Sequence, residues 1–388
     1  MMIILNAIHL IKRKMKSCLM LFFEFYNKLF QMRGFCSSYL TSVSYKKILK
    51  LSDKRLKLDL FDYEQIAKPL KKYRTNEIWY YNEVYGLSHI FKKYTGYKDS
   101  YKLKFIAMHG VKHKNYNGPG YSWEFTQNAP LIFATSNFAK ENIERFVEKT
   151  VKVISGSVQI LYTDKYYNNE QFDERKAMLG KNLLVFPAHS MTTKVSLYNI
   201  SSFINEIKKV KKKYDFDSVT ICLFWRDIKR SIDKQYLGHG FNITCAGHTK
   251  DCNFFPRLRT IIELSDVTMA NSDTSAMWYS LSLGKPFFLC HDNSLTYKNF
   301  NYIGDPEFDA GWYERHKENE SVSEIYDTFA EYTDYITEKQ KILIDKYCDI
   351  KNFKSPKEMQ DIFYESEQMY KTGKYRSFIH SFISDEDV

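Results

Sequence analysis

Several signatures of common enzyme families are missing from this sequence. No predicted strand is followed by Gly-x-Gly-x-x-Gly, and neither Gly-x-x-x-x-Gly-Lys-[Ser/Thr] nor Gly-x-Ser-x-Gly occurs. The phosphate-binding loops of dinucleotide and nucleoside-triphosphate enzymes, and the nucleophile turn of α/β-hydrolases, depend on those glycines. Their absence argues against a dinucleotide oxidoreductase, a P-loop NTPase and an α/β-hydrolase.

Long hydrophobic runs and paired cysteines are also missing. No stretch has the roughly 18 uncharged apolar residues that a membrane-spanning helix needs. The seven cysteines are odd in number and form no Cys-x-x-Cys, so we expect a reducing compartment with neither structural disulfides nor a zinc site. Zinc-finger spacing and RNA-recognition signatures are absent too, so we expect no nucleic-acid partner.

The composition that is present indicates a folded, basic protein. The 388 residues are 44% hydrophobic and 27% charged, enough to bury a sizeable core, and their number suggests roughly two to three domains. The net charge is +11, and residues 1–50 contribute +8 because Glu24 is their single acid. Residues 301–388 carry −9. This polarity favours an anionic partner near the N-terminus, either a membrane surface or a phosphate-bearing ligand.

The first 32 residues show apolar side chains at helical spacing, interrupted by Lys12-Arg13-Lys14. No small-residue cleavage site follows the short apolar run, which weakens a signal peptide. The pattern fits a helix that lies in the plane of an anionic membrane. A helix packed on the protein's own core remains the alternative. The apolar positions are Ile4, Ile8, Ile11, Met15, Leu19, Phe22, Tyr26 and Leu29.

From about residue 75 the chain alternates short apolar runs with helical patterns. Near-continuous apolar strands separated by helices predict parallel sheets that are covered on both faces. The alternation stops in a polar segment, Thr163–Asn182, whose composition predicts a linker, and then restarts. We therefore expect an α/β protein with two Rossmann-like domains. The expected divisions are a basic amphipathic segment at 1–50, domains at 51–175 and 176–320, and C-terminal helices with an acidic tail at 321–388. The expected strands are 103–108, 131–134, 151–154, 183–186, 219–225, 241–245, 267–270 and 287–290.

Polar side chains directly follow many of these strands. Ligands of open parallel sheets bind beyond the carboxyl ends of the strands, so these residues are candidates for a site. They are His109, His189, Arg226, His248 and Ser272.

The strongest local feature is a strand that runs into hydroxyl residues and then a helix. Asn271-Ser272-Asp273-Thr274-Ser275 follows the strand, and the helix ends before Gly284-Lys285-Pro286. The free backbone amides and positive dipole at a helix N-terminus, together with hydroxyl groups, can hold a phosphate. Ser272, Thr274 and Ser275 are therefore candidate phosphate ligands, although plain helix capping explains them equally well. Asp273 would repel an anion, so we expect it to point away or to serve another group.

The three histidines that follow strands suit proton transfer and phosphate binding. His109 can act as a general base on a hydroxyl near neutral pH, while His189 and His248 can donate hydrogen bonds to phosphate oxygens. No pair among the three has the i, i+4 spacing of a helical metal site, and no Asp-x-Asp follows a strand, so we expect no metal. Each histidine taken singly could equally be structural.

Arginines and lysines near these strands divide into two groups. Arg226 suits a diphosphate because its planar fork is bidentate and always charged, with an ion pair to Asp227 as the alternative. Arg257 and Arg259 are expected on a solvated face, as is the lysine run 208–213 at a helix end.

With these residues the chain resembles bacterial glycosyltransferases of the two-Rossmann-domain, or GT-B, type. The likeness is strongest from Leu183 to Asp292, where Ser265-Asp266, the segment 271–275 and Leu283-Gly284-Lys285-Pro286 look like a donor-binding segment. CDP-glycerol glycerophosphotransferases have a comparable segment, and bacterial sialyltransferases have a similar serine/threonine motif. The His109-Gly110 pair also echoes these enzymes. The His-Pro dipeptide of the sialyltransferases is missing from this chain, because Thr249 follows His248. This difference argues against a CMP-sialate donor.

This resemblance implies roles for the candidate residues. The acceptor would lie on the first domain, with His109 as catalytic base. The donor phosphates would lie on the second domain, bound by His189, Arg226, His248, Ser272, Thr274 and Ser275. Those groups would stabilise the leaving phosphate without a metal. The C-terminal helices would cross back to the first domain.

The expected function is transfer of a sugar, or a sugar-like group, from a nucleotide-activated donor to a hydroxyl of a cell-surface glycan or lipid-linked acceptor. Capsule or lipopolysaccharide synthesis would be its setting, and no cofactor besides the nucleotide-sugar substrate is expected. The expected location is cytoplasmic, with peripheral contact to the inner face of the cytoplasmic membrane. Two alternatives stay open: a nucleotide-sugar epimerase of the same shape, and a non-enzymatic scaffold of polysaccharide assembly at the membrane.

Overall fold

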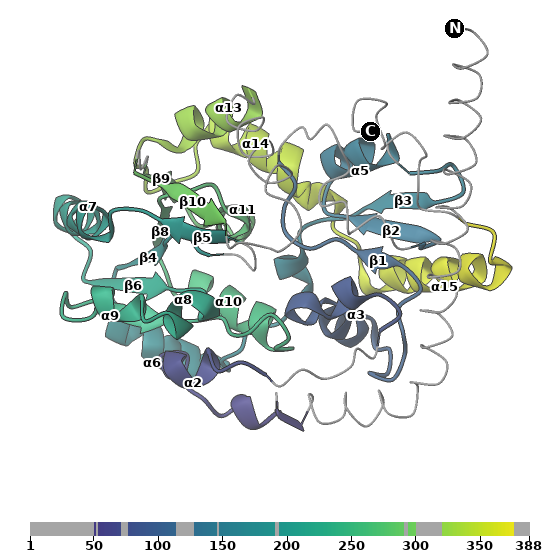
Figure 1. Ribbon diagram of the computed structural model, residues 1–388, viewed down its shortest axis with the longest axis horizontal. Coiled ribbons are helices and arrows are strands. Elements are labelled where there is room, and N and C mark those ends of the chain that lie inside the picture. The colour runs from purple at the N-terminus through teal and green to yellow at the C-terminus, as the bar shows by residue number, and fades with distance from the viewer. Residues whose placement is uncertain are drawn as a thin grey trace, which may run out of the picture.

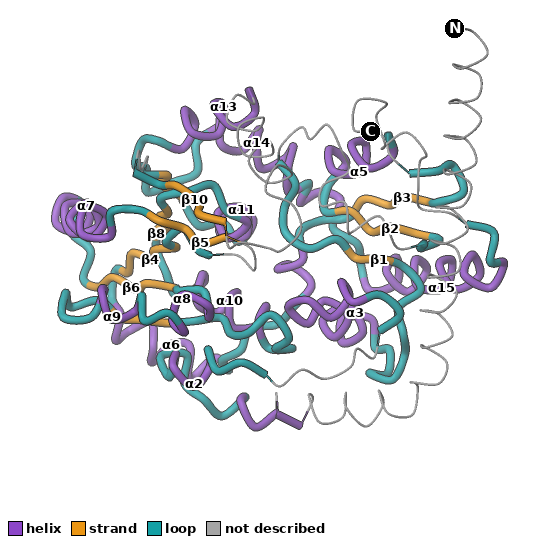
Figure 2. Tube along the Cα trace, viewed as in Figure 1, coloured by secondary structure: helices purple, strands orange, loops and turns teal. Residues whose placement is uncertain are grey.

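The chain is an α/β protein with two parallel sheets (Figure 1). Figure 2 shows the strands of each sheet lying between helices. None of the described helices is long and apolar enough to cross a membrane. The amphipathic segment 1–32 lies outside the described residues. The computed structural model describes residues 50–51, 53–70, 77–113, 128–145, 147–190, 194–290, 294–299 and 320–375.

The smaller sheet has three parallel strands in the order β1-β2-β3. All four residues of β2 are buried, as its apolar sequence predicts. Ser136 then caps the next helix, accepting a hydrogen bond from the Ala139 amide at 3.1 Å. The expected strand at 103–108 is reduced to two residues. The bounds are β1 Ile106–Ala107, β2 Leu131–Ala134, α5 Asn137–Glu144 and β3 Lys152–Ser155.

The larger sheet has five parallel strands in the order β7-β6-β4-β8-β9. Its central strand β4 is buried at every position, which explains the continuous apolar run that predicts it. The expected strand at 219–225 ends three residues earlier, and Trp225 begins a helix instead. The bounds are β4 Asn182–Phe186, α7 Ile200–Lys213, β6 Ser218–Cys222, α8 Trp225–Lys229, α9 Asp233–Tyr236, β7 Asn242–Thr244, α10 Phe254–Glu263, β8 Val267–Ala270, α11 Ser275–Ser282 and β9 Phe287–Leu289.

Three further elements differ from the sequence prediction. The expected linker at Thr163–Asn182 is wrong, because most of it is helix α6 (Asn169–Leu179). Asn168 and Gln171 form a capping box at its start. Leu179 is its one buried residue, so the sequence of this helix shows no amphipathic pattern. The strands β5 (Lys194–Leu197) and β10 (Thr296–Asn299) form a separate antiparallel pair. No apolar run predicts them.

The remaining helices precede β1, follow β3 or end the chain. The C-terminal helix α15 packs against α3, and the hydroxyl of Tyr94 donates to the carbonyl of Lys354 at 2.9 Å. Helix α14 contacts both α5 and α11. The bounds are α2 Tyr63–Ile66, η1 Tyr80–Gly86, α3 Leu87–Thr95, η2 Gln159–Tyr162, α13 Glu320–Phe329, α14 Glu338–Cys348, η3 Ile350–Asn352 and α15 Pro356–Thr372.

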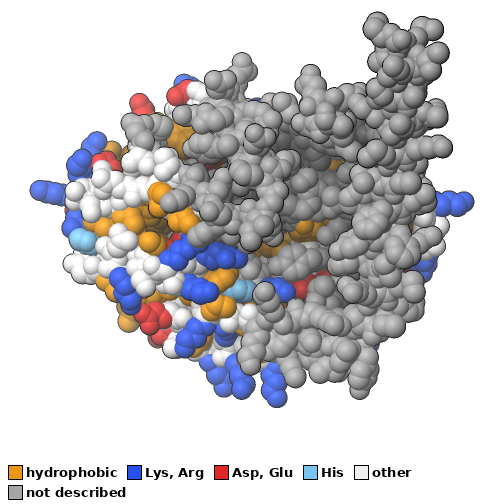
Figure 3. All heavy atoms as spheres, viewed as in Figure 1, with side chains coloured by type: hydrophobic (Ala, Val, Ile, Leu, Met, Phe, Trp, Pro, Cys, Tyr) orange, Lys and Arg blue, Asp and Glu red, His pale blue; other side chains and the backbone are white. Residues whose placement is uncertain are grey.

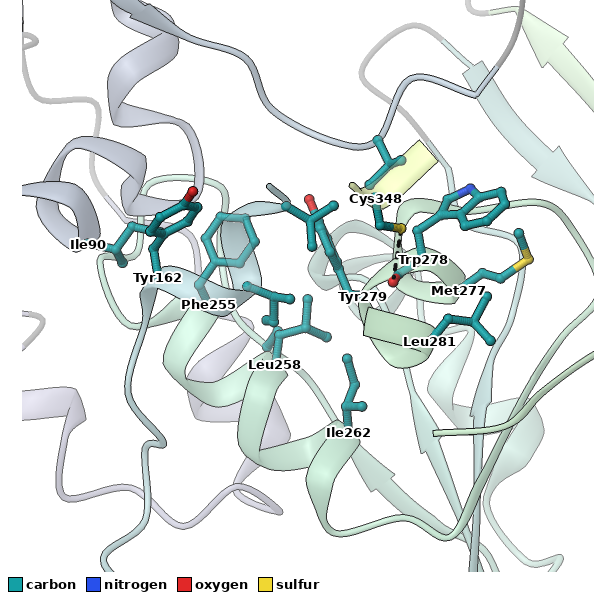
Figure 4. Packing of buried hydrophobic residues seen from close by; sticks show 14 of the residues in the cluster. Ile90, Tyr162, Phe255, Leu258, Ile262, Met277, Trp278, Tyr279, Leu281 and Cys348 are labelled. Carbon is teal, nitrogen blue, oxygen red and sulfur yellow. Dashed lines mark hydrogen bonds between the residues drawn. The ribbon is translucent and has the colours of Figure 1, made fainter. Parts of the chain in front are cut away.

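One hydrophobic cluster contains residues of both sheets, among them Phe133 of β2 and Leu184 of β4. Figure 4 shows how α10 and α11 contribute to it, with Phe255 and Leu258 near Tyr162 of η2. The Cys348 thiol of α14 donates to the carbonyl of Trp278 at 3.7 Å. Helices α10, α11 and α14 therefore connect the two sheets through buried apolar contacts.

Among the residues that the structure describes, two ion pairs are completely buried. Lys92 Nζ lies 2.7 Å from Glu77 Oε1, and both side chains are fully excluded from solvent. Arg257 Nη1 lies 2.9 Å from Asp251 Oδ2 with the same burial. The expectation that Arg257 lies on a solvated face is therefore wrong. The charge of Arg257 is compensated by Asp251, six residues earlier in the chain.

Candidate functional site

The carboxyl ends of four strands in the larger sheet form a continuous row of contacts. Trp225 follows β6 and His248 follows β7, and the centroids of their rings are 4.3 Å apart. Phe224 follows β6 and His189 follows β4, and the centroids of their rings are 4.8 Å apart. After β4 and β8, the amide of Ala188 donates to Asn271 Oδ1 at 2.7 Å. The strand-end residues that the sequence singles out in this sheet therefore share one edge.

The N-terminus of α11 lies at the β8 end of this row. Thr274 is its N-cap, and the Ala276 amide donates to Thr274 Oγ1 at 3.4 Å. This distance exceeds the usual 2.7–3.2 Å of an N–H···O bond, so the cap is weak and a stronger acceptor could replace it. Ser275 is half-buried, whereas Ser272 is only 5% exposed. Thr274 and Ser275 are therefore the more accessible of the three predicted phosphate ligands.

The loop after β1 contacts this helix terminus directly. The amide of Val111 donates to Ser275 Oγ at 3.1 Å. Gly110 has a φ of +70°, and a Cβ there would lie 3.0 Å from Ser275 Oγ. The backbone approaches the hydroxyl this closely because residue 110 has no side chain. The structure therefore brings together the two features that the sequence analysis emphasises, His109-Gly110 and the hydroxyl cluster.

His109 is half-buried and surrounded by aromatic rings. Its ring is nearly parallel to that of Tyr81, with centroids 6.4 Å apart, and lies 6.3 Å from the ring of Tyr85. The preceding residue is held in place, because Gln159 Nε2 donates to the carbonyl of Met108 at 2.5 Å. His109 therefore occupies a defined position between this anchor and the Gly110 contact with Ser275.

A second histidine near the helix terminus is missed by the sequence analysis. His113 Nε2 lies 2.9 Å from Asp273 Oδ2, and His113 Nδ1 lies 3.2 Å from the carbonyl of Val111. Asp273 thus serves another group, as expected of a carboxylate that would otherwise repel a phosphate. The sequence signal was the four-residue spacing of His109 and His113. The pair with Asp273, 160 residues away, has no local signal.

Two histidines in the row present different chemistry. His189 Nδ1 donates to the carbonyl of Ser190 at 3.1 Å, so a neutral His189 has only an acceptor at Nε2. It can donate to a phosphate from Nε2 when the ring is protonated. His248 Nδ1 instead accepts from the Lys250 amide at 3.1 Å, so the neutral ring carries its hydrogen on Nε2. Burial, helped by the positive charge of Arg55, lowers the pKa of His248 to about 4, and His248 is a neutral donor at pH 7.

This low pKa predicts that stability falls at acidic pH. An unfolded imidazole takes up its proton near pH 6.5, whereas folded His248 does so near pH 4. Between these values the unfolded state binds more protons, so the free energy of unfolding decreases as pH falls from about 6.5 towards 4. His248→Gln is expected to flatten this decrease in urea unfolding curves at pH 7 and pH 5. His239→Gln, on an exposed side chain, is the control, and equal pH dependence in the two variants would contradict the prediction.

Arg226 lies within α8 rather than directly after a strand. Its guanidinium carbon is 4.6 Å from the ring centroid of Trp225. The neighbouring carboxylate of Asp227 is buried and accepts a hydrogen bond from the Ser190 amide at 3.2 Å. Asp227 therefore ties the end of β6 to the end of β4.

Strand order separates the six predicted phosphate ligands into two groups. Arg226 and His248 follow β6 and β7, whereas Ser272, Thr274 and Ser275 follow β8. Strands β6 and β8 are two spacings apart and β7 and β8 are three, or about 10 and 14 Å at 4.8 Å per spacing. His189 follows β4, which lies between the groups.

Carboxylates near this edge are already engaged. Asp251 pairs with Arg257 and with Arg55, Asp273 with His113, and Asp227 with a backbone amide. No group of three or more His, Cys, Asp or Glu side chains that could hold a metal ion occurs among the residues that the structure describes.

Comparisons with known proteins place the chain in no family. No family model matches it, and no curated protein matches it in sequence. Among solved structures, it is similar to sucrose-phosphate synthase from Thermosynechococcus elongatus, with 10% identity over 70% of this chain and 69% of that one, at a TM-score of 0.32. It is also similar to TarM, with 12% identity over 74% of this chain and 52% of that one, at a TM-score of 0.28. At TM-scores this low, neither similarity indicates a function for this chain.

Proposed function

We propose that this protein is a glycosyltransferase. It would move a sugar, or a sugar-like group, from a nucleotide-activated donor to a hydroxyl of a cell-surface glycan or a lipid-linked acceptor. The observation that supports this most is the hydrogen bond from Val111 to Ser275, because it sets the His109 loop against the N-terminus of α11. A candidate base and a candidate phosphate site are thus neighbours, as transfer from a phosphate to a hydroxyl requires.

In this proposal the donor phosphate lies at the N-terminus of α11. The hydroxyls of Thr274 and Ser275 donate to it, Ser272 and His189 lie on the flank towards β4, and the positive end of the helix dipole favours the charge. The phosphate replaces Thr274 as the acceptor for the Ala276 amide, whose present bond is long at 3.4 Å. These groups stabilise the negative charge that develops on the leaving phosphate.

The acceptor hydroxyl attacks the anomeric carbon of the donor sugar. As the new C–O bond forms, the bond from that carbon to the phosphate oxygen breaks, and the electron pair leaves with the phosphate. His109 takes the proton of the hydroxyl. Asp273 fixes His113 beside the same helix terminus, so His113 positions the loop that carries His109.

The site gives less support to a nucleotide-sugar epimerase activity. Epimerisation needs a free carboxylate or comparable base that removes a proton from carbon, and Asp227, Asp251 and Asp273 are each held by a hydrogen bond or an ion pair. A product assay distinguishes the two activities, since an epimerase changes a nucleotide sugar without any acceptor.

The basic N-terminal segment motivates a further part of the proposal. We propose that the protein works on the cytoplasmic side of the membrane, where the +8 charge of residues 1–50 favours contact with anionic lipid. The described surface over the larger sheet also carries many Lys and Arg side chains (Figure 3).

Replacing Ser272 and Ser275 together by Ala is expected to weaken nucleotide binding about tenfold or more. Each lost hydrogen bond to a charged group is worth roughly 1.5–3 kcal/mol, so even one lost contact gives that effect. A thermal-shift screen of UDP, CMP, CDP and GDP identifies the nucleotide, and calorimetry then measures its affinity.

Ser280→Ala is the matched control for this experiment. Ser280 lies on the same helix, and its hydroxyl donates to the carbonyl of Ala276 at 2.8 Å, one turn from the terminus. The control is expected to keep the wild-type affinity. An unchanged affinity in the Ser272/Ser275 variant would show that the nucleotide phosphate binds elsewhere.

A further inference from the structure

The loop after β1 is held by side chains on both sides of His109. The carbonyl of Met108 accepts a hydrogen bond from Gln159 Nε2 at 2.5 Å, and the amide of Val111 donates to Ser275 Oγ at 3.1 Å. Gln159 belongs to η2 and Ser275 to α11. Two elements that are far apart in the sequence therefore fix the backbone before and after this histidine.

Tyr279 of α11 connects these two attachments. Its hydroxyl donates to Gln159 Oε1 at 3.0 Å. The backbone N–H of Gly110 is a hydrogen-bond donor to the same hydroxyl, and this interaction opposes the rise in the pKa of Tyr279 that burial causes. Tyr279 lies four residues after Ser275, so both side chains leave α11 on the same face, one turn apart. Helix α11 thus holds the loop at two successive positions.

The direction of each hydrogen bond in this network follows from the groups involved. A backbone carbonyl can only accept, so Gln159 Nε2 faces Met108 and Gln159 Oε1 faces Tyr279. The single hydrogen of the Tyr279 hydroxyl is then committed to Oε1, which leaves the phenolic oxygen as the acceptor for the Gly110 amide. Removing this hydroxyl therefore takes a partner from both Gln159 and Gly110.

The two side chains that form the network are almost inaccessible to solvent. Gln159 is 1% exposed and Tyr279 is 4% exposed. The ring of Tyr279 packs edge-on against Phe255, with ring centroids 5.7 Å apart (Figure 4). A buried polar network whose hydrogen bonds are satisfied is rigid, because water cannot replace the partners. We therefore expect this network to fix the loop in one geometry.

We propose that Tyr279 and Gln159 are positioning residues for His109. They hold the backbone on both sides of it, so that its imidazole meets the acceptor hydroxyl next to the phosphate at the N-terminus of α11. One helix then holds both the candidate base and the candidate phosphate site, which fixes the geometry between them. The rigid loop stands on the hydrogen bonds themselves, whereas its role in sugar transfer rests on the proposed function.

The first experiment measures how firmly the loop is held in the full chain. Tyr279→Phe removes the hydroxyl but keeps the ring, and Gln159→Met removes the amide but keeps the length of the side chain. Hydrogen–deuterium exchange of a peptide that contains residues 109–111, measured by mass spectrometry, is expected to accelerate about tenfold in each variant, because a buried hydrogen bond is lost.

Tyr94→Phe is the matched control for this experiment. It also removes a tyrosine hydroxyl, which donates to the carbonyl of Lys354 at 2.9 Å and takes no part in the network. The control is expected to leave the exchange of residues 109–111 and the turnover unchanged. Circular dichroism spectra verify that each variant is folded.

The second experiment asks whether the network acts through His109. Tyr279→Phe is expected to lower kcat of sugar transfer about 10- to 100-fold, while calorimetry gives a nucleotide affinity near the wild-type value. In the His109→Ala background the same substitution is expected to have no further effect. A positioning residue acts only while the group that it positions is present, so the two effects do not add.

Three results would overturn the positioning role. They are an unchanged exchange rate in both network variants, an equal loss of kcat with and without His109, and a loss of nucleotide affinity that matches the loss of kcat. The last two would show that Tyr279 supports α11 as a whole. If the wild-type protein transfers no sugar, the proposed function and the catalytic role of the network fail together. The exchange rates still decide whether Tyr279 and Gln159 hold the loop.

Discussion

Turnover of sugar transfer is expected to fall by about 10²- to 10⁴-fold when His109 is replaced by Ala. This is the usual effect of losing a general base, because the attacking hydroxyl then keeps its proton as the new bond forms. Nucleotide affinity is expected to stay near the wild-type value, because the proposed phosphate site uses the hydroxyls and amides of α11. Steady-state kinetics and calorimetry on the same preparation measure the two quantities.

The pH profile and a matched variant make this prediction specific. The wild-type rate is expected to fall as pH is lowered, since a protonated imidazole cannot accept a proton; an ordinary histidine titrates near pH 6.5. His239→Ala, at an exposed site, is expected to leave turnover unchanged. Near-normal turnover in His109→Ala would remove it from the mechanism. His113, Asp273 and His189 would then be tested next, together with Glu124, which lies outside the described residues.

Replacing Lys92 by Met is expected to lower the free energy of unfolding by about 3–5 kcal/mol. Lys92 Nζ contacts Glu77 Oε1 at 2.7 Å and donates to the carbonyls of Asp99 and Tyr101 at 3.0 and 2.9 Å. Its loss removes the Lys92 countercharge from the buried carboxylate of Glu77, which keeps the hydrogen bond from the Leu103 amide at 2.9 Å. Urea unfolding followed by circular dichroism measures the change.

The adjacent lysine is the control for Lys92. Lys93 pairs with Asp164 at 2.9 Å, but the two side chains are 64% and 75% exposed. Exposed pairs contribute about 0–1 kcal/mol, so Lys93→Met is expected to be nearly neutral. Adding Glu77→Gln to Lys92→Met should recover part of the loss, because the unpaired charge disappears. Equal stability of the two single lysine variants would refute a role for the buried pair.

The parallel strands could be predicted because strands that are buried on both faces form short, continuous apolar runs in the sequence. Leu183–Phe186 is apolar at each position and lies in the centre of the larger sheet, where both faces of a strand are covered. Helix α6 shows the opposite case. It is mostly exposed, so its sequence has the composition of a loop, and its clearest signal is the cap formed by Asn168 and Gln171.

The candidate site was predictable only in part, for a related reason. His109 and the hydroxyl cluster at 272–275 each follow a strand, which made them visible as candidates. Their contact through Val111 and Ser275 spans 164 residues, so its geometry depends on the assembled sheets. The burial of Arg257 was missed because a helical arginine normally reaches solvent, and here Asp251 and the segment around Arg55 enclose it.

The early segment that carries Arg55 has a consequence for how the chain is made. Arg55 bonds to Asp251, 196 residues later, and Thr244 donates to the carbonyl of Leu60 across 184 residues. At a translation rate of about 5–20 residues per second, Arg55 leaves the ribosome roughly 10–40 s before Asp251 does. Tyr166 and Tyr167, which also bond to this segment, emerge well before Asp251 does. Chain order and folding order therefore diverge in part: the contacts of this early segment with the strand and loop near residue 250 form only after those residues have emerged.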